Sequence, residues 1–573
     1  MSKETKENWR EEQAKREIGV TDISRGAAIA VSIAFMAAIG GVAVMQHGIA
    51  LRELSRNDVS GKLSFWGAFD GAGGAMLEAW RSAATLPRRV LDPNAVLLKR
   101  IDAFQEELDD TCFLTELTVG PVQEWLCRLG AGNEKAYVGQ KGWLFYEPGV
   151  HYVTGPGFLE PRRLSARLAG GNEYVDPPQP DPRRAILDFA EQIGERGIRL
   201  IVVPAPVKPS IHPEHFGWRR GVTGQPIQNR SYEAFKRDLE ASGVLVFDPA
   251  PALAQAAAET GTAQYLRTDT HWTPTAMARC AEALARFVEQ HIPLRPGNSK
   301  RLVRTEMTMT NDGDIAAMLK LPPDQDLYPP QSVTVHQVNA RRDGALWQPD
   351  KTAEILLLGD SFANIYSIPE MKWGESAGLA PQLSFCLGRS VDALTRNDGG
   401  AHSTRKMLSR RLARGEDRLA GKQVVIWEFA ARELAVGDWK LIDMAVGEVP
   451  QSGFFVPAPG SSVVVEAVVS ARTGAPRPGS VPYKDHILSV LLEDLRSGDI
   501  PLEGNRVLVY MSSMVDNVWQ TPARYREGRK VRLRLQNWED VERRYGSLNR
   551  SEFDDESIML ESPCWGTEVD GPL

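Results

Sequence analysis

Two short segments of this sequence carry the residue types of a serine nucleophile and its base. The first is Glu354–Ile365, in which the apolar run Ile355–Leu358 ends at Gly359 and is followed by Asp360 and Ser361. Such a run is typical of a buried strand in a parallel sheet, and open α/β sheets hold ligands at the carboxyl ends of their strands. A helix that begins here would add free N–H groups beside the hydroxyl. The alternative is an ordinary Gly-Asp-Ser turn before a helix.

The second segment is Arg267–Pro274, in which Asp269 stands two positions before His271. In an extended segment these side chains point the same way. A serine hydroxyl needs a base, usually a histidine, whose tautomer is held by a carboxylate. Alone, the pair also fits a capped loop or two of three metal ligands. With the turn at Ser361 it completes a Ser–His–Asp set, in which Ser361 is the nucleophile, His271 the base and Asp269 the orienting group.

The elements around these segments alternate between strand and helix patterns. We predict a strand, turn and strand over 136–146, strands at 198–204, 244–248, 383–388 and 424–429, and helices at 184–196, 232–242, 274–287, 362–368 and 403–414. This alternation indicates an α/β fold, with a mainly parallel sheet and helices on both faces.

The two segments resemble those of a known family. GDSF after an apolar strand, with DTHW upstream, is similar to the SGNH-hydrolase-like acetyltransferases of the alginate O-acetylation (AlgX/AlgJ) type. Three further segments carry the resemblance, VGQKGWLFY at 138–146, LIVVPAPVKPSIH at 200–212 and VVIWEFAAREL at 424–434, so it covers about residues 135–445. The order Asp, His, Ser also fits. The resemblance implies an SGNH-like fold and acetyl transfer through an acetyl-serine intermediate.

Related hydrolases stabilise an oxyanion with the N–H of the serine and that of a glycine farther along the chain. Ser361, Gly399 and Gly400 are therefore oxyanion candidates, together with the neighbouring Asn397. The alternative is that the glycines only form a helix-terminal turn. The segment after the strand at 424–429 departs from the wider hydrolase pattern, because it lacks the asparagine that supplies a third donor.

Three side chains are candidates for contacting substrate. Lys208 follows the predicted strand at 198–204, although a solvated loop lysine is the alternative. Trp272 either stacks on a sugar ring or packs inside the protein. Arg432 stands in the segment where the missing asparagine would be expected. The five cysteines include no CxxC pair, and we expect neither a metal nor a cofactor.

The net charge of −7 and the pI near 5.9 argue against nucleic acid as a partner. Residues 26–51 contain no Asp, Glu, Lys or Arg, which predicts a transmembrane signal anchor. The alternatives are a buried helix and a cleaved signal peptide. Flanking Lys and Arg leave the orientation open. The resemblance implies a single-pass protein of the inner membrane with its catalytic domain in the periplasm, where Cys112 and Cys127 could pair as a disulfide.

These assignments divide the chain into five parts: a cytoplasmic tail (1–25), the anchor (26–51), a stalk or helical connector (52–133), the SGNH-like acetyltransferase domain (134–445) and a β-rich module (446–573). The module is predicted from strand patterns at 462–470, 485–495, 506–512 and 530–535. Acetyltransferases of the resembled type can carry a carbohydrate-binding module at this position. Its aromatic residues, Trp519, Tyr525, Trp538 and Tyr545, either stack on sugars or form its core.

The leading functional interpretation is a periplasmic O-acetyltransferase that acetylates hydroxyls of an alginate-like exopolysaccharide. The resemblance implies that a membrane-bound O-acyltransferase supplies the acetyl group. One alternative is a polysaccharide or lipid acetyl-esterase, which would share every motif because acceptor choice depends on how the pocket excludes water. The other is a non-catalytic, polysaccharide-binding component of an export complex.

Overall fold

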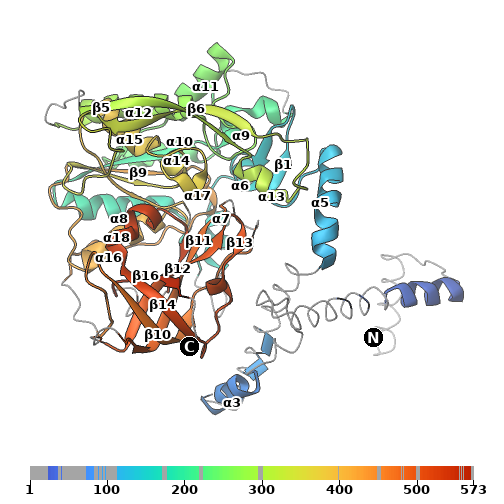
Figure 1. Cartoon of the computed structure of the whole chain (residues 1–573). Coiled ribbons are helices and arrows are strands. Elements are labelled where there is room, and N and C mark those ends of the chain that lie inside the picture. The colour runs from blue at the N-terminus through green and yellow to red at the C-terminus, as the bar shows by residue number, and fades with distance from the viewer. Residues whose placement is uncertain are drawn as a thin grey trace, which may run out of the picture. The chain divides into compact units, whose positions relative to one another are not determined.

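The computed structural model describes residues 24–35, 72–82, 113–170, 177–217, 224–294, 301–397, 399–447, 453–478, 483–498, 504–553 and 561–569, with a few shorter pieces between them (Figure 1). The chain divides into two compact units, Met1–Val122 and Gln123–Leu573. Helix α3 (Ala72–Ser82) belongs to the first unit, and α5 (Phe113–Arg128) runs across the boundary.

The predicted anchor at residues 26–51 is described continuously only as far as residue 35, and this part is helical. In the part of the chain that the structure describes, no helix is both long and apolar enough to cross a membrane. Most of the tail and most of the stalk lie outside the described residues, as does Cys112, one half of the predicted disulfide. Its predicted partner, Cys127, is buried and forms no disulfide with any cysteine that the structure describes.

A five-stranded parallel sheet in the order β4-β3-β9-β7-β8 forms the centre of the second unit. Its strands are β3 (Arg199–Ala205), β4 (Leu245–Val246), β7 (Ile355–Gly359), β8 (Asp392–Thr395) and β9 (Val424–Ala430). The chain moves outward from β3 to β4 on one side and from β7 to β8 on the other. The carboxyl ends of β3, β9 and β7 therefore meet at a topological switch point, where open α/β sheets bind ligands.

Successive side chains of each strand pack on opposite faces of the sheet. In β3, Ile201 and Val203 join one apolar cluster, and Leu200 and Val202 join the other. The first cluster includes residues of α11 (Ala250–Thr260), α12 (Pro274–His291) and α15 (Leu379–Leu387), and the second includes residues of α8 (Pro182–Gly194), α10 (Tyr232–Ala241) and α16 (Ser403–Ala413). The predicted parallel sheet with helices on both faces is confirmed.

Two local predictions were wrong. Residues 383–388 were predicted as a strand, but 383–387 belong to helix α15 and Gly388 caps it. The helix is buried on nearly every side and so shows no helical period in its sequence. The helix predicted at 362–368 is the short α14 (Ser361–Asn364), which begins at the serine itself.

A hairpin of β5 (Leu302–Asn311) and β6 (Gln331–Ala340), which the sequence did not predict, also belongs to the second unit. The remaining elements up to residue 436 are β1 (Ala136–Val138), β2 (Leu144–Tyr146), α6 (Glu147–Thr154), α7 (Pro161–Leu168), α9 (Lys208–Ile211), η2 (Pro213–Phe216), α13 (Asp314–Met318), η4 (Pro369–Met371) and α17 (Glu433–Val436).

The carboxyl-terminal module is a β-rich barrel, drawn in orange and red in Figure 1. Its elements are β10 (Ser462–Arg472), β11 (His486–Arg496), β12 (Arg506–Val515), β13 (Val518–Trp519), η5 (Thr521–Arg524), β14 (Lys530–Asn537), α18 (Trp538–Tyr545), β15 (Arg550–Ser551) and β16 (Cys564–Glu568). The ring closes because β12 pairs with β16 on one side and with β11 on the other. Tyr525 and Trp538 are buried, and Tyr545 stacks on Trp565, so these aromatic rings pack within the protein.

Candidate active site

The acid–base half of the candidate site is a loop that runs into helix α12. Thr273 caps this helix by accepting a hydrogen bond from Ala276 N–H, and Pro274 occupies the first turn, where its missing N–H costs nothing. Within the loop, His271 Nδ1 lies 2.7 Å from Asp269 Oδ1. The predicted pairing of Asp269 with His271 is therefore present in the structure.

Asp269 accepts four hydrogen bonds. His271 provides two of them to Oδ1, from Nδ1 (2.7 Å) and from its backbone N–H (3.0 Å). The indole of Trp373 (2.9 Å) and the backbone N–H of Asp314 (3.1 Å) donate to Oδ2. Four bonds use about all the acceptor sites of a carboxylate. This saturation favours an orienting carboxylate over a metal ligand.

The same contacts set the charge of the loop. Burial by itself raises the pKa of Asp269, but the hydrogen bonds from His271 and Trp373 and the attraction to His271 outweigh it and lower the pKa to about 2. The neighbouring Asp314 accepts a hydrogen bond from Thr270 N–H (2.7 Å). Burial and repulsion from Asp269 raise the pKa of Asp314 to about 6. Of the two carboxylates, Asp269 is thus the one that stays ionised beside the imidazole over the wider pH range.

The second nitrogen of His271, Nε2, is buried and has no hydrogen-bond partner in the described part of the protein. The His271 ring contacts the Phe362 ring, with centroids 4.8 Å apart. In addition, the indole of Trp272 donates to the carbonyl oxygen of Phe362 (3.1 Å). The loop is therefore docked on the residue that follows Ser361, and an imidazole nitrogen near it is left without a protein partner.

The serine half of the site is a tight turn between β7 and α14. Asp360 caps α14 by accepting from Phe362 N–H (2.8 Å), and its other oxygen accepts from Ala430 N–H (2.7 Å) at the end of β9. A side chain at Gly359 would meet the Ala363 Cβ at 2.6 Å, so only glycine permits this turn. Ser361 is 7% exposed. No hydrogen bond of its hydroxyl is found among the residues that the structure describes.

Glu428, on β9, lies beneath this turn and accepts a hydrogen bond from Asp360 N–H (3.0 Å). Burial and repulsion from Asp360 raise the pKa of Glu428 well above its usual range. We therefore expect Glu428 to be a neutral acid, which can accept this hydrogen bond without placing a second charge beside Asp360.

The structure separates the substrate candidates. Trp272 is fully buried, and both its indole N–H and its carbonyl are hydrogen-bonded to the α14 region, so it is a packing residue and not a sugar platform. Arg432 follows β9, and its guanidinium lies 5.8 Å from the Phe362 ring centroid. A narrow pocket is lined by Arg432, Phe362 and Lys208, among others. Arg432 thus keeps its candidate role.

Lys208 follows β3, as predicted, but the alternative of a solvated loop lysine is wrong. It is 3% exposed, and its ammonium donates to the carbonyl oxygens of Leu144 (2.7 Å) and Arg267 (3.2 Å). Burial lowers the pKa of Lys208 to about 7, and attraction to Asp269 and Asp314 offsets part of this effect. Lys208 therefore ties the end of β3 to the loop that carries the base.

Among the oxyanion candidates, Asn397 is next to α14, because its side-chain oxygen accepts from Asn364 Nδ2 (2.8 Å). Its backbone N–H donates to Ser547 of the module and is therefore not available to an oxyanion. Its side-chain amide nitrogen donates to Met371 Sδ (3.3 Å), which leaves one of its two N–H groups as a donor. Gly399 and Gly400 have φ values of +93° and +70°, which by themselves account for glycine at both positions. Their role as donors stays a prediction.

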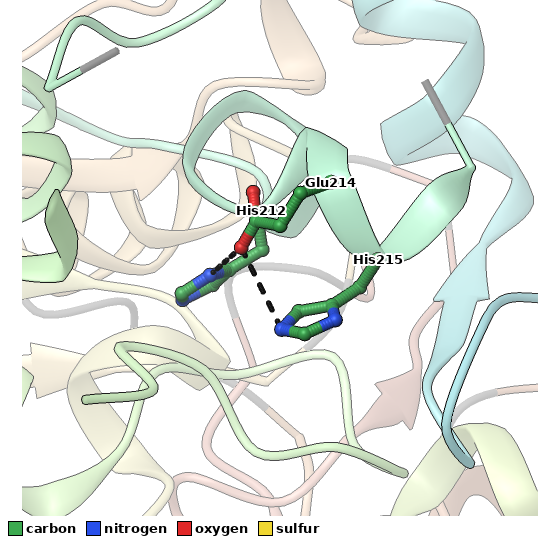
Figure 2. A group of neighbouring side chains, drawn as sticks. All are labelled: His212, Glu214 and His215. Carbon is green, nitrogen blue, oxygen red and sulfur yellow. Dashed lines mark hydrogen bonds and ion pairs between the residues drawn. The ribbon is translucent and has the colours of Figure 1, made fainter. Parts of the chain in front are cut away.

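A second group of titratable side chains, His212, Glu214 and His215, lies around η2 (Figure 2). One oxygen of Glu214 is 2.9 Å from His212 Nδ1 and 3.6 Å from His215 Nε2. However, His212 Nε2 accepts from the backbone N–H of Gln264 (2.9 Å), which places the proton of the neutral ring on Nδ1. A metal needs an unprotonated nitrogen, and Nδ1 is the one that faces the group. The hydrogen bonding favours a structural His–Glu pair.

The sequence patterns do not predict the site positions of Trp373 and Asp314, or the role of Glu428 beneath the turn. Trp373 is 104 positions from the carboxylate that it contacts. No local sequence pattern predicts that Trp373 contacts Asp269, because the contact depends on the path of the chain after α14. Asp314 had a weak signal, the Asn-Asp-Gly-Asp turn at 311–314.

Comparison with known proteins agrees with this geometry. The family model described as "SGNH hydrolase-like domain, acetyltransferase AlgX" matches residues 136–431, which is more than half of the chain. The chain belongs to this family. The predicted family resemblance is confirmed, and the match spans Asp269, His271 and Ser361.

Among named relatives, the chain is similar to a probable alginate O-acetylase AlgJ of Pseudomonas fluorescens, with 27% identity over 253 residues, 43% of this chain and 60% of the relative. The AlgJ of Pseudomonas aeruginosa is 26% identical over 257 residues, covering 42% and 61%. The chain thus spans about three fifths of the length of these curated relatives.

Among solved structures, the O-acetyltransferase domain of Pseudomonas putida AlgJ has a TM-score of 0.39 at 21% identity, covering 52% of this chain and 92% of that domain. Pseudomonas aeruginosa AlgX has a TM-score of 0.37 at 16% identity, covering 70% and 91%. The family assignment rests on the sequence match.

Proposed function

We propose that this protein is an O-acetyltransferase that acetylates hydroxyl groups of an alginate-like exopolysaccharide through an acetyl group on Ser361. The observation that carries the proposal is the His271–Asp269 pair, with its ionised carboxylate and its unpartnered Nε2 docked beside the first residues of α14. Such a pair can hold the proton that a serine hydroxyl must lose to become a nucleophile.

The proposed reaction has two transfers. In the first, His271 Nε2 takes the proton of Ser361 Oγ, Oγ bonds to the acetyl carbonyl carbon, and the bond to the donor breaks as the leaving group receives the proton. In the second, a sugar hydroxyl gives its proton to His271 and its oxygen bonds to the same carbon, and Ser361 Oγ leaves and recovers the proton. Asp269 stabilises the imidazolium in both steps.

Burial of the site supports transfer over hydrolysis. Ser361 and His271 are 7% and 3% exposed, so bulk water has little access to an acetyl-serine there. The names of the AlgJ relatives suggest alginate as the polymer. Arg432, beside Phe362, is then a candidate to pair with a uronate carboxylate.

The cellular setting is also part of the proposal. The uncharged stretch at 26–51 would anchor the protein in the inner membrane with the catalytic domain in the periplasm, and a membrane-bound O-acyltransferase would deliver the acetyl group. Protease treatment of sealed spheroplasts tests the topology. Digestion of the carboxyl-terminal part supports it, and complete protection contradicts it.

The test of activity uses the purified full-length chain in detergent, with 4-nitrophenyl acetate as donor and deacetylated alginate oligosaccharides as acceptor. Acetylated oligosaccharide, formed by the wild type and not by Ser361→Ala, is the expected result. Release of acetate at the same rate with and without oligosaccharide, and no acetylated sugar, would point to the esterase instead. If the protein neither acetylates the oligosaccharide nor releases acetate, the result supports the non-catalytic, polysaccharide-binding interpretation.

A further inference from the structure

The carboxyl-terminal module contacts the catalytic domain at the loop after β8, which leads to the active site. Thr395 Oγ1 and Ser547 Oγ are 2.9 Å apart, and Asn397 N–H donates to the Ser547 carbonyl oxygen at 3.2 Å. Between these two positions, Arg396 donates to Glu552 of the module (3.2 Å) and to the carbonyl oxygen of Arg550. The last residue of β8 and the first two residues of the loop are thus each held by the module.

The centre of this contact is a buried ionic group around Glu552. Its carboxylate is bonded by Arg396 and Arg410 of the catalytic domain and by Arg550 of the module (3.0 Å), and Tyr510 donates to it (3.0 Å). Burial alone raises the pKa of Glu552, but the three arginines outweigh it and hold the pKa well below the usual range. One ionised carboxylate therefore joins the two domains.

An apolar contact lies beside this group. Ile368, a few residues beyond α14, shares an apolar cluster with Tyr510, Trp538 and Trp565 of the module, and Met371 packs against it. The module therefore contacts the chain at two segments that follow the serine turn, the residues after α14 and the loop after β8.

The loop leads directly to the nucleophile. Arg396 N–H donates to the carbonyl oxygen of Gly359 (2.9 Å), two residues before Ser361. The Asn397 side chain accepts from Asn364, the last residue of α14 (2.8 Å). Because Asn397 gives its backbone N–H to Ser547 and its side-chain oxygen to Asn364, both the loop and the amide group are fixed in place.

We propose that the module is a positioning element of the active site: by holding Arg396 and Asn397 it fixes the oxyanion side of the Ser361 turn, whether or not a polysaccharide is bound. This inference rests on the proposed acetyl-transfer function and goes beyond it. A module that serves only to bind carbohydrate would affect reactions of the polymer alone. A positioning module affects every substrate, including the smallest ester.

The decisive variant is Glu552→Gln, which keeps the size of the side chain and removes the charge that joins the arginines. Its matched control is Glu493→Gln, in an exposed pair with Arg506 across two strands of the module (3.2 Å). For 4-nitrophenyl acetate we expect kcat of Glu552→Gln to fall roughly 10- to 100-fold with little change in KM, since small misplacements of an oxyanion donor cost this much. The control should stay within about twofold of the wild type.

Amide hydrogen exchange provides a readout independent of turnover. In Glu552→Gln the peptide that spans residues 392–397 should exchange faster at its Asn397 end, because Asn397 N–H loses its fixed acceptor, while strands β3, β7 and β9 stay protected. If this variant does not fold, Ser547→Ala replaces it, since it removes only the hydroxyl contact with Thr395. Its kcat for the small ester should fall about fivefold.

Folded Glu552→Gln, or Ser547→Ala in its place, with wild-type kcat for the small ester would overturn the positioning role. An inactive wild type, or an active Ser361→Ala, would instead refute the proposed function. In that case, unchanged exchange at 392–397 in Glu552→Gln would still overturn the positioning role, and faster exchange there would support it.

Discussion

The two halves of the candidate site are held in different ways. All four hydrogen bonds to Asp269 come from the catalytic domain, and two of them come from His271, two residues away. The serine half depends on distant elements. Asp360 is tied to β9, and the loop beside α14 is tied to the carboxyl-terminal module. The base is therefore oriented largely by its own loop, whereas the nucleophile's surroundings are set by the packing of two domains.

The largest expected loss of turnover comes from removing the reacting atom of either half of the site. Ser361→Ala removes the atom that carries the acetyl group, and His271→Ala removes the base, so each should reduce turnover to background. Because the halves act as one unit, the double variant should lose little more than either single variant. Steady-state turnover of 4-nitrophenyl acetate measures all three. A double variant much worse than both singles would show that the halves act separately.

The next effect acts within the base half. Asp269→Asn keeps the size of the side chain but no longer holds the imidazole in the tautomer that leaves Nε2 free to accept a proton. The corresponding change in serine proteases costs on the order of 10⁴ in turnover, and we expect a loss of that size. Circular dichroism establishes that the variant folds. A folded Asp269→Asn that keeps more than a tenth of wild-type turnover is incompatible with the assigned role.

A smaller effect tests whether the long-range contact to the base half matters. Trp373→Phe removes the indole N–H that donates to Asp269 and keeps the apolar ring. We expect kcat to fall roughly tenfold, as for the loss of one hydrogen bond to a charged group. The matched control is Trp427→Phe, since the Trp427 indole N–H, on β9, is buried and has no hydrogen-bond partner among the residues that the structure describes. Equal losses of kcat in both variants would mean that only packing was disturbed.

The smallest effect concerns stability and lies in the serine half. The pKa of Glu428 is raised well above its usual range, chiefly by burial, so the folded protein holds a proton that the unfolded chain releases above about pH 4.3. Wild-type stability should therefore decline as pH rises from there towards the folded-state pKa. Glu428→Gln mimics the neutral acid and should remove this decline.

Thermal unfolding between pH 5 and 9 measures the difference. The Tm of Glu428→Gln should match that of the wild type most closely at the acid end and exceed it increasingly towards the alkaline end. Glu493→Gln, on the surface of the module, should show no such trend. If the Tm of Glu428→Gln instead falls below that of the wild type at high pH, Glu428 is ionised in the folded protein.

The contrast between the halves also explains what the sequence could predict. The Asp-x-His pair and the strand-turn-serine pattern are local, and the structure contains the contact and the turn that they predict, as well as the layered α/β fold. The catalytic roles of these residues stay a prediction. Two contacts of the site, Trp373 with Asp269 and Ser547 with Asn397, join segments that are more than 100 positions apart in the sequence. No periodicity in the sequence predicts such contacts. Helix α15 was mistaken for a strand because full burial removed the polar residues that would show its period.

The central claim is that Ser361 carries the acetyl group during transfer. The most direct measurement is to quench the full-length protein during turnover of 4-nitrophenyl acetate, digest it, and locate the added acetyl mass by peptide sequencing in the mass spectrometer. We predict one acetyl group on Ser361 in the wild type, which disappears when an oligosaccharide acceptor is added, and none on that peptide in His271→Ala. Acetyl transfer to the acceptor with Ser361 unmodified at every time point would contradict the account.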